Sequence, residues 1–230
     1  MIFDPLYLLF VAPGLLLALY ATFKVKSTFK RYSEVGIASG LSGAEVAREM
    51  LRRNGIRDVG VEQHEGWLSD HYDPSAKVVR LSPDVFQGRS ISSVGVAAHE
   101  CGHALQHAQG YAAMALRQKL VVPANLGSNL SFVIIIVGSW LQAMNLVWLG
   151  ILLFSAVVLF QLVTLPVEFN ASSRARALLT QTGIVTSAEG VGVGKVLNAA
   201  ALTYVAALIT SVLTLAYYIM RFTGGSSRDD

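Results

Sequence analysis

Long apolar runs dominate the hydrophobic pattern of this chain. Four such runs, at 2–23, 124–145, 146–167 and 199–220, contain a single charged residue between them, Asp4. A helix rises about 1.5 Å per residue, so each run is long enough to cross a hydrocarbon core of about 30 Å. One run alone would also suit a buried core helix, but four runs in 230 residues predict a multi-pass membrane protein.

The first run differs from a cleaved signal peptide at both ends. No basic residue precedes it, and Lys24-Val25-Lys26 follows it directly, where a cleavage site needs small residues. We therefore expect this run to be retained as a membrane span.

Two helices are expected in the polar segment that follows. Ser42 and Glu45 fit a helix capping box, and Gly55 suits the end of that helix. A longer helix is expected from about residue 90 to about residue 109, and Gly110 ends it.

Short strands are expected between these two helices. Residues 59–63 and 77–81 have strand character, with a turn at 72–75 between them. Residues 78–82 are a candidate edge strand, along which an extended peptide could pair through its backbone. An ordinary strand inside the sheet fits this pattern equally well. The polar segment is therefore predicted to be a small α+β unit.

Composition supports the membrane assignment and limits the partners. Charged residues make up 14% of the chain, against about 25% in soluble domains. The net charge of +3 is small, and no basic run is interleaved with aromatic residues. Nucleic acid is therefore not expected as a partner. The single cysteine, Cys101, excludes an internal disulfide.

Basic residues predict which side of the membrane the polar segments occupy. They flank the apolar runs within 24–123 and 168–198, whereas the turn near 142–145 has none. By the positive-inside rule, both polar segments are expected to face the cytoplasm, and we expect the membrane to be a bacterial cell (inner) membrane. In this topology Arg221 would lie on the side opposite the cytoplasm, so this basic residue is an exception to the rule.

The predicted fold is a mainly α membrane protein with about four transmembrane helices and a small cytoplasmic α+β unit. The predicted parts are a transmembrane helix at 1–23, a cytoplasmic segment at 24–123, a transmembrane hairpin at 124–167, a second cytoplasmic segment at 168–198, a fourth transmembrane helix at 199–220 and a tail at 221–230.

The sequence His99-Glu100-Cys101-Gly102-His103 lies inside the longer expected helix. Histidines four residues apart share one helix face, about 6 Å apart along the axis, so both imidazoles can reach one Zn²⁺. The intervening glutamate can accept a proton from metal-bound water, whose pKa zinc lowers to about 7. A surface helix containing these residues by chance is the alternative. The apolar neighbours of the motif favour burial, where its polar side chains need a partner such as a metal.

A catalytic zinc needs a third protein ligand and an open position. Cys101 points about 200° around the helix from His99, and His107 lies about 12 Å along the axis from His99. Neither can therefore share one ion with His99 on an unbroken helix. We expect His107 to cap the helix, to donate to a carboxylate or to face substrate.

The remaining candidates for the third ligand are His64, His71 and carboxylates elsewhere. Glu168 stands out among them because it directly follows the third apolar run. An ordinary interfacial glutamate that pairs with Arg174 is the alternative interpretation of this residue.

Several stretches together resemble the membrane zinc metallopeptidases of the YugP type, and the resemblance covers nearly the whole chain. The matching stretches are Leu68-Ser69-Asp70-His71-Tyr72-Asp73-Pro74, Val79-Arg80-Leu81-Ser82, Ala97-Ala98-His99-Glu100-Cys101-Gly102-His103-Ala104-Leu105-Gln106-His107, 165–175 and 199–207. A more distant similarity concerns the order of the expected elements: a strand, the helix with His99 and His103, the membrane spans, and a helix that carries a glutamate. The heat-shock membrane peptidases and the CAAX-prenyl endopeptidases have a similar order.

This relationship implies a zincin-like catalytic unit with His99, His103 and Glu168 as zinc ligands and Glu100 as general base. The distant relatives usually carry an aspartate four residues after the ligand glutamate. This chain has Ser172 there, so a carboxylate that supports a ligand histidine is not carried over.

The sequence therefore predicts a membrane-embedded zinc endopeptidase. Its expected cofactor is Zn²⁺, and its expected substrate is a membrane or membrane-proximal polypeptide. His71, His107 and Arg174 are candidates for contacting substrate or supporting a ligand. His71 is either an oxyanion donor or a partner of Asp73 in the turn.

Two other functions fit parts of the pattern. An intramembrane protease is one, but the motif helix is not part of an apolar run of about twenty residues. A non-catalytic zinc-binding membrane scaffold is the other, and Glu100 argues against it because a structural site needs no base.

Overall fold

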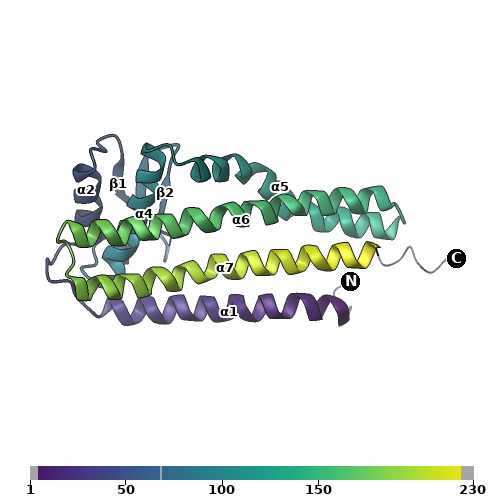
Figure 1. The fold of residues 1–230 in the computed structure, drawn as a ribbon, viewed down its shortest axis with the longest axis horizontal. Coiled ribbons are helices and arrows are strands. Elements are labelled where there is room, and N and C mark those ends of the chain that lie inside the picture. The colour runs from purple at the N-terminus through teal and green to yellow at the C-terminus, as the bar shows by residue number, and fades with distance from the viewer. Residues whose placement is uncertain (1–4, 68, 224–230) are drawn as a thin grey trace. The chain divides into compact units, whose positions relative to one another are not determined.

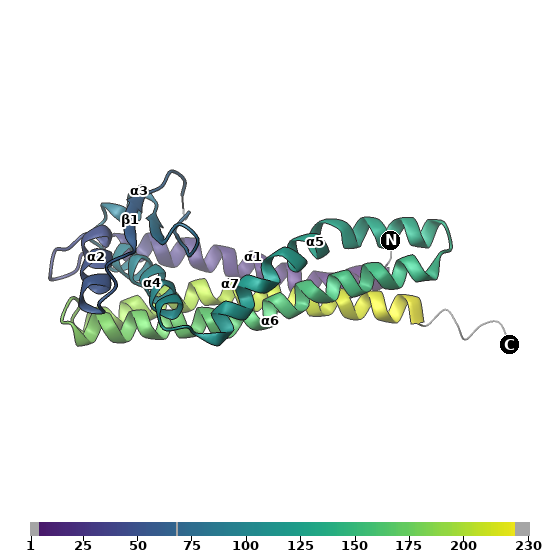
Figure 2. The same ribbon diagram turned by 90° about the horizontal axis from the view of Figure 1, so that it is seen from above.

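The computed structural model describes residues 5–67 and 69–223, so Asp4, Leu68 and the expected tail from Gly224 lie outside the described residues. Within them the chain is mostly helical, with one small sheet (Figures 1 and 2). The elements are α1 (Pro5–Ser33), α2 (Gly43–Arg53), β1 (Gly60–Gln63), β2 (His71–Asp73), β3 (Val78–Leu81), α3 (Pro83–Phe86), α4 (Ile91–Ala108), α5 (Ala112–Trp140), α6 (Met144–Gln181) and α7 (Ser187–Thr223).

Four of these helices, α1, α5, α6 and α7, are long and apolar enough to cross a membrane. The prediction of a mainly α membrane protein with four spans and a small α+β unit is confirmed. The chain divides into a helical unit, built from 1–21, 115–165 and 203–230, and a polar unit, built from 22–114 and 166–202.

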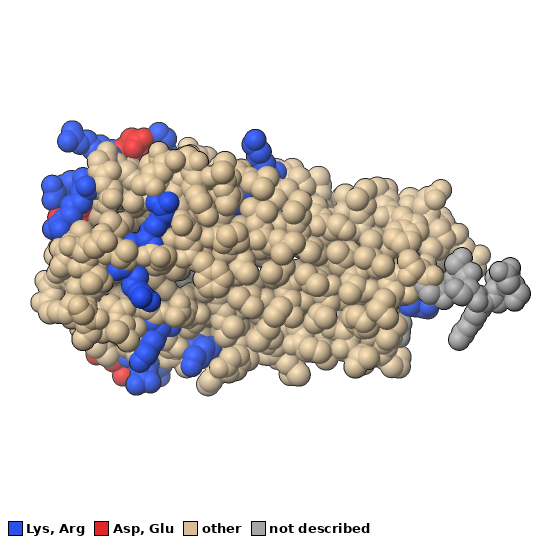
Figure 3. Space-filling model, in the orientation of Figure 1, with Lys and Arg blue, Asp and Glu red and all other residues tan. Residues whose placement is uncertain are grey.

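Residues that face outward in the helical unit are largely apolar, as lipid requires. Leu16, Val122 and Leu152 are each about two-thirds exposed, at 66%, 65% and 69%. On the face drawn in Figure 3, this unit shows almost no charge, whereas Lys and Arg gather over the polar unit. Its interior is a cluster of aliphatic and tyrosine side chains, formed by Ile135, Val147, Ile151, Tyr217 and Tyr218.

Close helix contacts in the helical unit depend on glycine. A Cβ on Gly14 would lie 2.9 Å from the Cα of Thr210, and a Cβ on Gly150 would lie 2.9 Å from the carbonyl oxygen of Ser131. These distances leave no space for a methyl group. Small residues allow membrane helices to pack backbone against backbone, where lipid supplies no hydrophobic driving force for their association.

The helices extend well beyond the apolar runs. α5 begins at Ala112, α6 continues to Gln181, and α7 begins at Ser187. Hydropathy marks the stretch that can face lipid, but helix formation continues wherever residues of good propensity follow. Glu168 therefore lies within a continuous helix, two residues after Pro166, which α6 also includes.

The sheet has the strand order β1-β3-β2, with β1 parallel and β2 antiparallel to β3. The expected strands at 59–63 and 77–81 are confirmed as β1 and β3, but β2 was expected to be part of a turn. Asp73 has both roles, because it ends β2 while its carboxylate accepts from the amides of Ser75 and Ala76.

Of the two interpretations of 78–82, the edge strand is wrong and the ordinary strand inside the sheet is confirmed. β3 is the middle strand of the sheet, and Val78, Val79 and Arg80 have partners in both β1 and β2. The short β2 supplies the second partner strand, and its three residues give too little alternation to be recognised. The outer strands are β1 and β2.

The helix ends in the polar unit follow the sequence signals closely. Ser42 and Glu45 form the predicted capping box of α2, and Gly55 follows that helix with a φ of 73°. Gly110 follows α4 with a φ of 64°. The backbone at both glycines is left-handed, a conformation that favours glycine after a helix.

Candidate metal centre

Helix α4 carries the motif through the core of the polar unit. Ser90 caps its start by accepting a hydrogen bond from the amide of Ser93. Most of its residues are buried, including Val94, Ala97 and Ala98 on the turn before the motif. The apolar surroundings predicted for the motif are confirmed.

Gly102 sets the distance between α4 and α6. A Cβ at this position would lie 2.6 Å from the carbonyl oxygen of Ala171 and 3.1 Å from its Cα. Only a glycine therefore allows the two helices to approach this closely. The contact lies one residue from His103 on α4 and three residues from Glu168 on α6, so it brings these two side chains together.

Three side chains converge at this crossing. Oε2 of Glu168 lies 3.1 Å from Nε2 of His99 and 3.5 Å from Nε2 of His103. The two imidazole rings are 4.7 Å apart and nearly perpendicular. Glu168 is 1% exposed and His103 is 6% exposed. Within the described residues, this is the one group of three or more His, Cys, Asp or Glu side chains that could hold a metal ion.

The donor set and its dimensions fit zinc. Two imidazole nitrogens and one carboxylate oxygen are ligands that zinc accepts, and three protein ligands leave one position open. Ligands of a tetrahedral zinc, each about 2.0–2.2 Å from the ion, lie about 3.3–3.6 Å apart. The separation of 3.5 Å between Glu168 and His103 falls within that spacing, the separation of 3.1 Å between Glu168 and His99 is slightly shorter, and all three ligand atoms lie within 4.8 Å of one another.

The outer nitrogen of each histidine also has a partner. Nδ1 of His99 lies 3.1 Å from the hydroxyl of Ser172, and Nδ1 of His103 lies 3.0 Å from Oε1 of Gln106. When Nδ1 carries the proton and donates it, Nε2 is left as the lone-pair nitrogen that a metal requires. The side-chain oxygen of Gln106 can only accept, so it favours this tautomer in His103, and the hydroxyl of Ser172 can accept from Nδ1 of His99 in the same way.

Gln106 is itself held on α6. Its amide nitrogen donates to the carbonyl of Val167 at 2.8 Å and to the side-chain oxygen of Asn170 at 3.0 Å. Arg174 donates to the same Asn170 oxygen at 2.6 Å and also to the side chain of Gln109. A chain of hydrogen bonds thus runs from Arg174 to His103.

Sequence reasoning missed Gln106 and the partner role of Ser172. Ser172 stands where the distant relatives carry an aspartate, and its hydroxyl contacts His99 in place of a carboxylate. Gln106 lies three residues after His103, a spacing that places two side chains on one helix face. That spacing was the available signal for Gln106.

The electrostatics of His103 reflect two opposing effects. Burial lowers its pKa, but the hydrogen bond to Glu168 and the charges of Glu100 and Glu168 raise it by more. Without a metal, the negative charges of Glu100 and Glu168 therefore favour a protonated imidazole at His103. A divalent cation would satisfy the same negative charge.

Glu100 lies beside the cluster without being part of it. It is 8% exposed, and among the described residues its carboxylate accepts no hydrogen bond from the protein. Burial raises the pKa of nearby Asp70, and the charge of Glu100 adds to that shift. Asp70 in turn accepts hydrogen bonds from the amide and hydroxyl of Ser82.

The other histidines lie outside the cluster. Nδ1 of His71 is 2.8 Å from the carbonyl oxygen of Ser69, and its Nε2 is 3.4 Å from Arg80, so it contacts neither Asp73 nor the cluster. The ring of His64 packs against that of His71. Nδ1 of His107 lies 2.8 Å from the hydroxyl of Tyr72. The proposed substrate roles of His71, His107 and Arg174 stay predictions.

Cys101 occupies the opposite side of α4, as helix geometry predicts. Its thiol contacts the carbonyl oxygen of Ala47 on α2 at 3.6 Å. Burial raises the pKa of this thiol, so it is a poor ligand and a poor nucleophile.

Comparison with known proteins agrees with this geometry. The sequence profile of a family described as "putative neutral zinc metallopeptidase" matches residues 7–223. The "putative membrane protease YugP" of Bacillus subtilis (strain 168) is 50% identical over 220 residues, which cover 96% of this chain and 98% of that protein. No solved structure matches the chain at a significant level.

Proposed function

Since this chain belongs to the neutral zinc metallopeptidase family, we propose that it is a membrane-embedded zinc endopeptidase. The single observation that carries the proposal is the buried convergence of His99, His103 and Glu168, with Glu100 next to it on α4. We assign the first three as zinc ligands and Glu100 as the general base.

Zinc bound there would polarise the scissile carbonyl and make water acidic enough to react at neutral pH. The task of Glu100 is to accept the proton of that water on a carboxylate oxygen and to pass it to the nitrogen of the leaving amine. Its carboxylate is suited to this role because no protein donor within the described residues occupies it.

The remaining side chains of the centre orient the histidine ligands and do not bind the metal themselves. Ser172 and Gln106 hold the protons of His99 and His103 on Nδ1, which keeps both Nε2 atoms available. Arg174 and Asn170 fix Gln106 in turn. Such outer partners are typically worth 10- to 100-fold in metal affinity or activity.

We propose that the centre faces the cytoplasm from a bacterial cell membrane, and that its substrate is a membrane or membrane-proximal polypeptide. Residues 24–114 and 166–198 belong to the same polar unit. This supports the proposal that both segments lie on the same side of the membrane. The basic residues that flank the spans favour the cytoplasmic side.

The two alternatives are less well supported. An intramembrane protease would place its catalytic helix in lipid, but α4 is not among the four candidate spans. A non-catalytic zinc scaffold would have no use for a buried carboxylate next to the ligands.

The test is hydrolysis of a quenched fluorescent peptide library and of casein by the detergent-solubilised protein. We expect turnover that a chelator abolishes and added zinc restores. Glu100→Gln keeps the shape of the side chain but not its basicity, so turnover is expected to fall by about 10²–10⁴-fold while zinc content is unchanged. Activity of Glu100→Gln within a few-fold of the parent would remove Glu100 as the base. Zinc-bound protein that hydrolyses no member of the library would favour the scaffold.

A further inference from the structure

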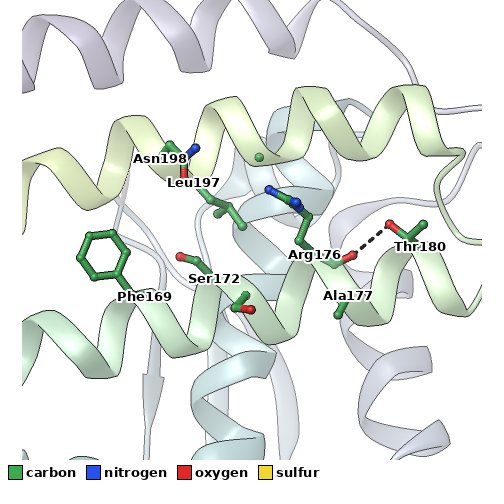
Figure 4. A pocket seen from close by; sticks show the side chains of 9 residues that line it. Phe169, Ser172, Arg176, Ala177, Thr180, Leu197 and Asn198 are labelled. Carbon is green, nitrogen blue, oxygen red and sulfur yellow. Dashed lines mark hydrogen bonds between the residues drawn. The ribbon is translucent and has the colours of Figure 1, made fainter.

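A cavity between α6 and α7 in the polar unit lies outside the chemistry described above. It has a volume of about 390 Å³ and is lined on α6 by Phe169, Ser172, Ser173, Arg176 and Thr180 and on α7 by residues that include Asn198. Figure 4 shows the side chain of Arg176 reaching from α6 toward α7. We call this cavity the α6–α7 pocket.

Glycine on α7 makes room for the arginine. A Cβ on Gly194 would lie 3.1 Å from Nη1 and 3.3 Å from Cδ of Arg176. The guanidinium therefore lies against bare helix backbone. Among the described residues it makes no hydrogen bond or ion pair with another side chain. Its five donors are available to a ligand.

The pocket is positive and rich in donors. A second hollow continues from it past Arg176 and adds Lys195 and Ser187 to the wall. No aspartate or glutamate lines either hollow. Neither Lys195 nor Arg176 is paired with an acidic side chain in the part of the chain that the structure describes. An anion is the ligand that this lining fits.

Ser172 contributes a hydroxyl group to the pocket, and its contact with His99 orients that hydroxyl. Its oxygen lies 3.1 Å from Nδ1 of His99. When that nitrogen donates its proton to Ser172, the hydroxyl proton of Ser172 remains for an acceptor on the other side. Ser172 also lines the pocket, so an anion bound by Arg176 is such an acceptor.

The position of the pocket along both helices indicates the source of the anion. On α6 the uncharged run ends at Val167, directly before the pocket, and on α7 the last charged residue before the apolar run is Lys195, which lines the adjoining hollow. The pocket therefore lies where both helices change from apolar to polar, the level at which lipid phosphates lie in a bilayer. Phe169 is 48% exposed on the apolar side of the pocket.

We propose that the α6–α7 pocket binds the phosphate of an anionic phospholipid headgroup. Arg176 is the main contact through a two-pronged hydrogen bond, and Lys195, Ser172, Ser173 and Asn198 surround it. The proposal does not depend on hydrolysis or on zinc.

The test measures lipid binding to the metal-free, detergent-solubilised full chain by native mass spectrometry. The probes are dihexanoyl phosphatidylglycerol, dihexanoyl phosphatidylcholine and inorganic phosphate. We expect saturable binding of phosphatidylglycerol and at least about tenfold weaker binding to Arg176→Gln, because a charge-assisted contact of this kind is lost. Gly194→Leu fills the space beside Arg176 and is expected to weaken binding similarly. Lys119→Gln, which removes an exposed cation of α5, is expected to bind within twofold of the parent.

Several results would overturn the proposal. Equal binding of the two lipids, or unchanged binding by both Arg176→Gln and Gly194→Leu, would mean that the pocket does not recognise an anionic headgroup. Displacement of the lipid by inorganic phosphate at equal concentration would assign the pocket to free phosphate. Displacement by a peptide with a free C-terminal carboxylate, but not by the same peptide amidated, would assign it to substrate.

Discussion

Replacement of Gln106 by leucine tests how far the metal centre depends on residues that do not bind metal. Gln106 is fully buried and connects Nδ1 of His103 to the carbonyl of Val167 and the side chain of Asn170. Leucine has a similar volume and is apolar, so the core between α4 and α6 should remain filled. The change therefore removes hydrogen bonds and leaves packing largely intact.

The expected effect follows from the tautomers of His103. With no acceptor at Nδ1, the imidazole gains more by carrying its proton on Nε2, which lies 3.5 Å from Oε2 of Glu168. Zinc must then displace that proton before it can bind. Loss of such an outer partner weakens metal binding about 10- to 100-fold, or about 1.4–2.8 kcal/mol.

The assay is zinc affinity, measured by competition with a chromophoric chelator at fixed pH. Gln87→Leu is the matched control, because Gln87 is exposed and its side-chain amide donates a hydrogen bond to the side chain of Gln63, away from the metal centre. We expect the control to bind zinc as the parent does. A dissociation constant of Gln106→Leu within twofold of the parent, in protein that melts at the same temperature, would refute the role assigned to Gln106.

Two further predictions concern the helix crossing and the membrane topology. Gly102→Leu forces side-chain atoms into the backbone of Ala171, so we expect lower thermal stability, by about 1–3 kcal/mol or more, together with loss of zinc; a variant that melts and binds zinc like the parent would contradict the close-packing argument. Cysteines placed at Arg57 and Ala188, both exposed, should react with an impermeant maleimide from the same, cytoplasmic side, since native Cys101 is buried; labelling from opposite sides would separate the two polar segments and exclude a shared centre.

The sequence alone indicated most of the proposed ligand set because its signals are local. The spacing of His99 and His103 on one helix needs only the helical period, and the capping box at Ser42 needs only three residues of context. The four spans follow from apolar runs whose length matches the bilayer. Each of these inferences is independent of how distant segments pack.

Features that depend on packing were not accessible in the same way. The sequence contains Gly102 within the motif, but it does not show that the backbone of Ala171 on α6 packs against this glycine. Glu168 was selected as the candidate third ligand by elimination and by a family resemblance. That its carboxylate lies beside both histidines depends on the crossing of α4 and α6. The sequence left open whether β3 lies at the sheet edge or inside the sheet, because β2 is only three residues long. Gln106 had the right spacing, yet a buried glutamine offers no chemical signal until its partners on α6 are known.

The most direct test of the central claim is the zinc content of Glu168→Ala. The purified parent should retain about one zinc per chain after dialysis. Glu168→Ala should lose most of that metal and its peptidase activity together, because only the two histidines of α4 remain as ligands. Glu62→Ala, which removes an exposed carboxylate on β1, is the control and should behave as the parent. Full zinc occupancy and normal turnover in Glu168→Ala would contradict the assignment of His99, His103 and Glu168 as the metal centre.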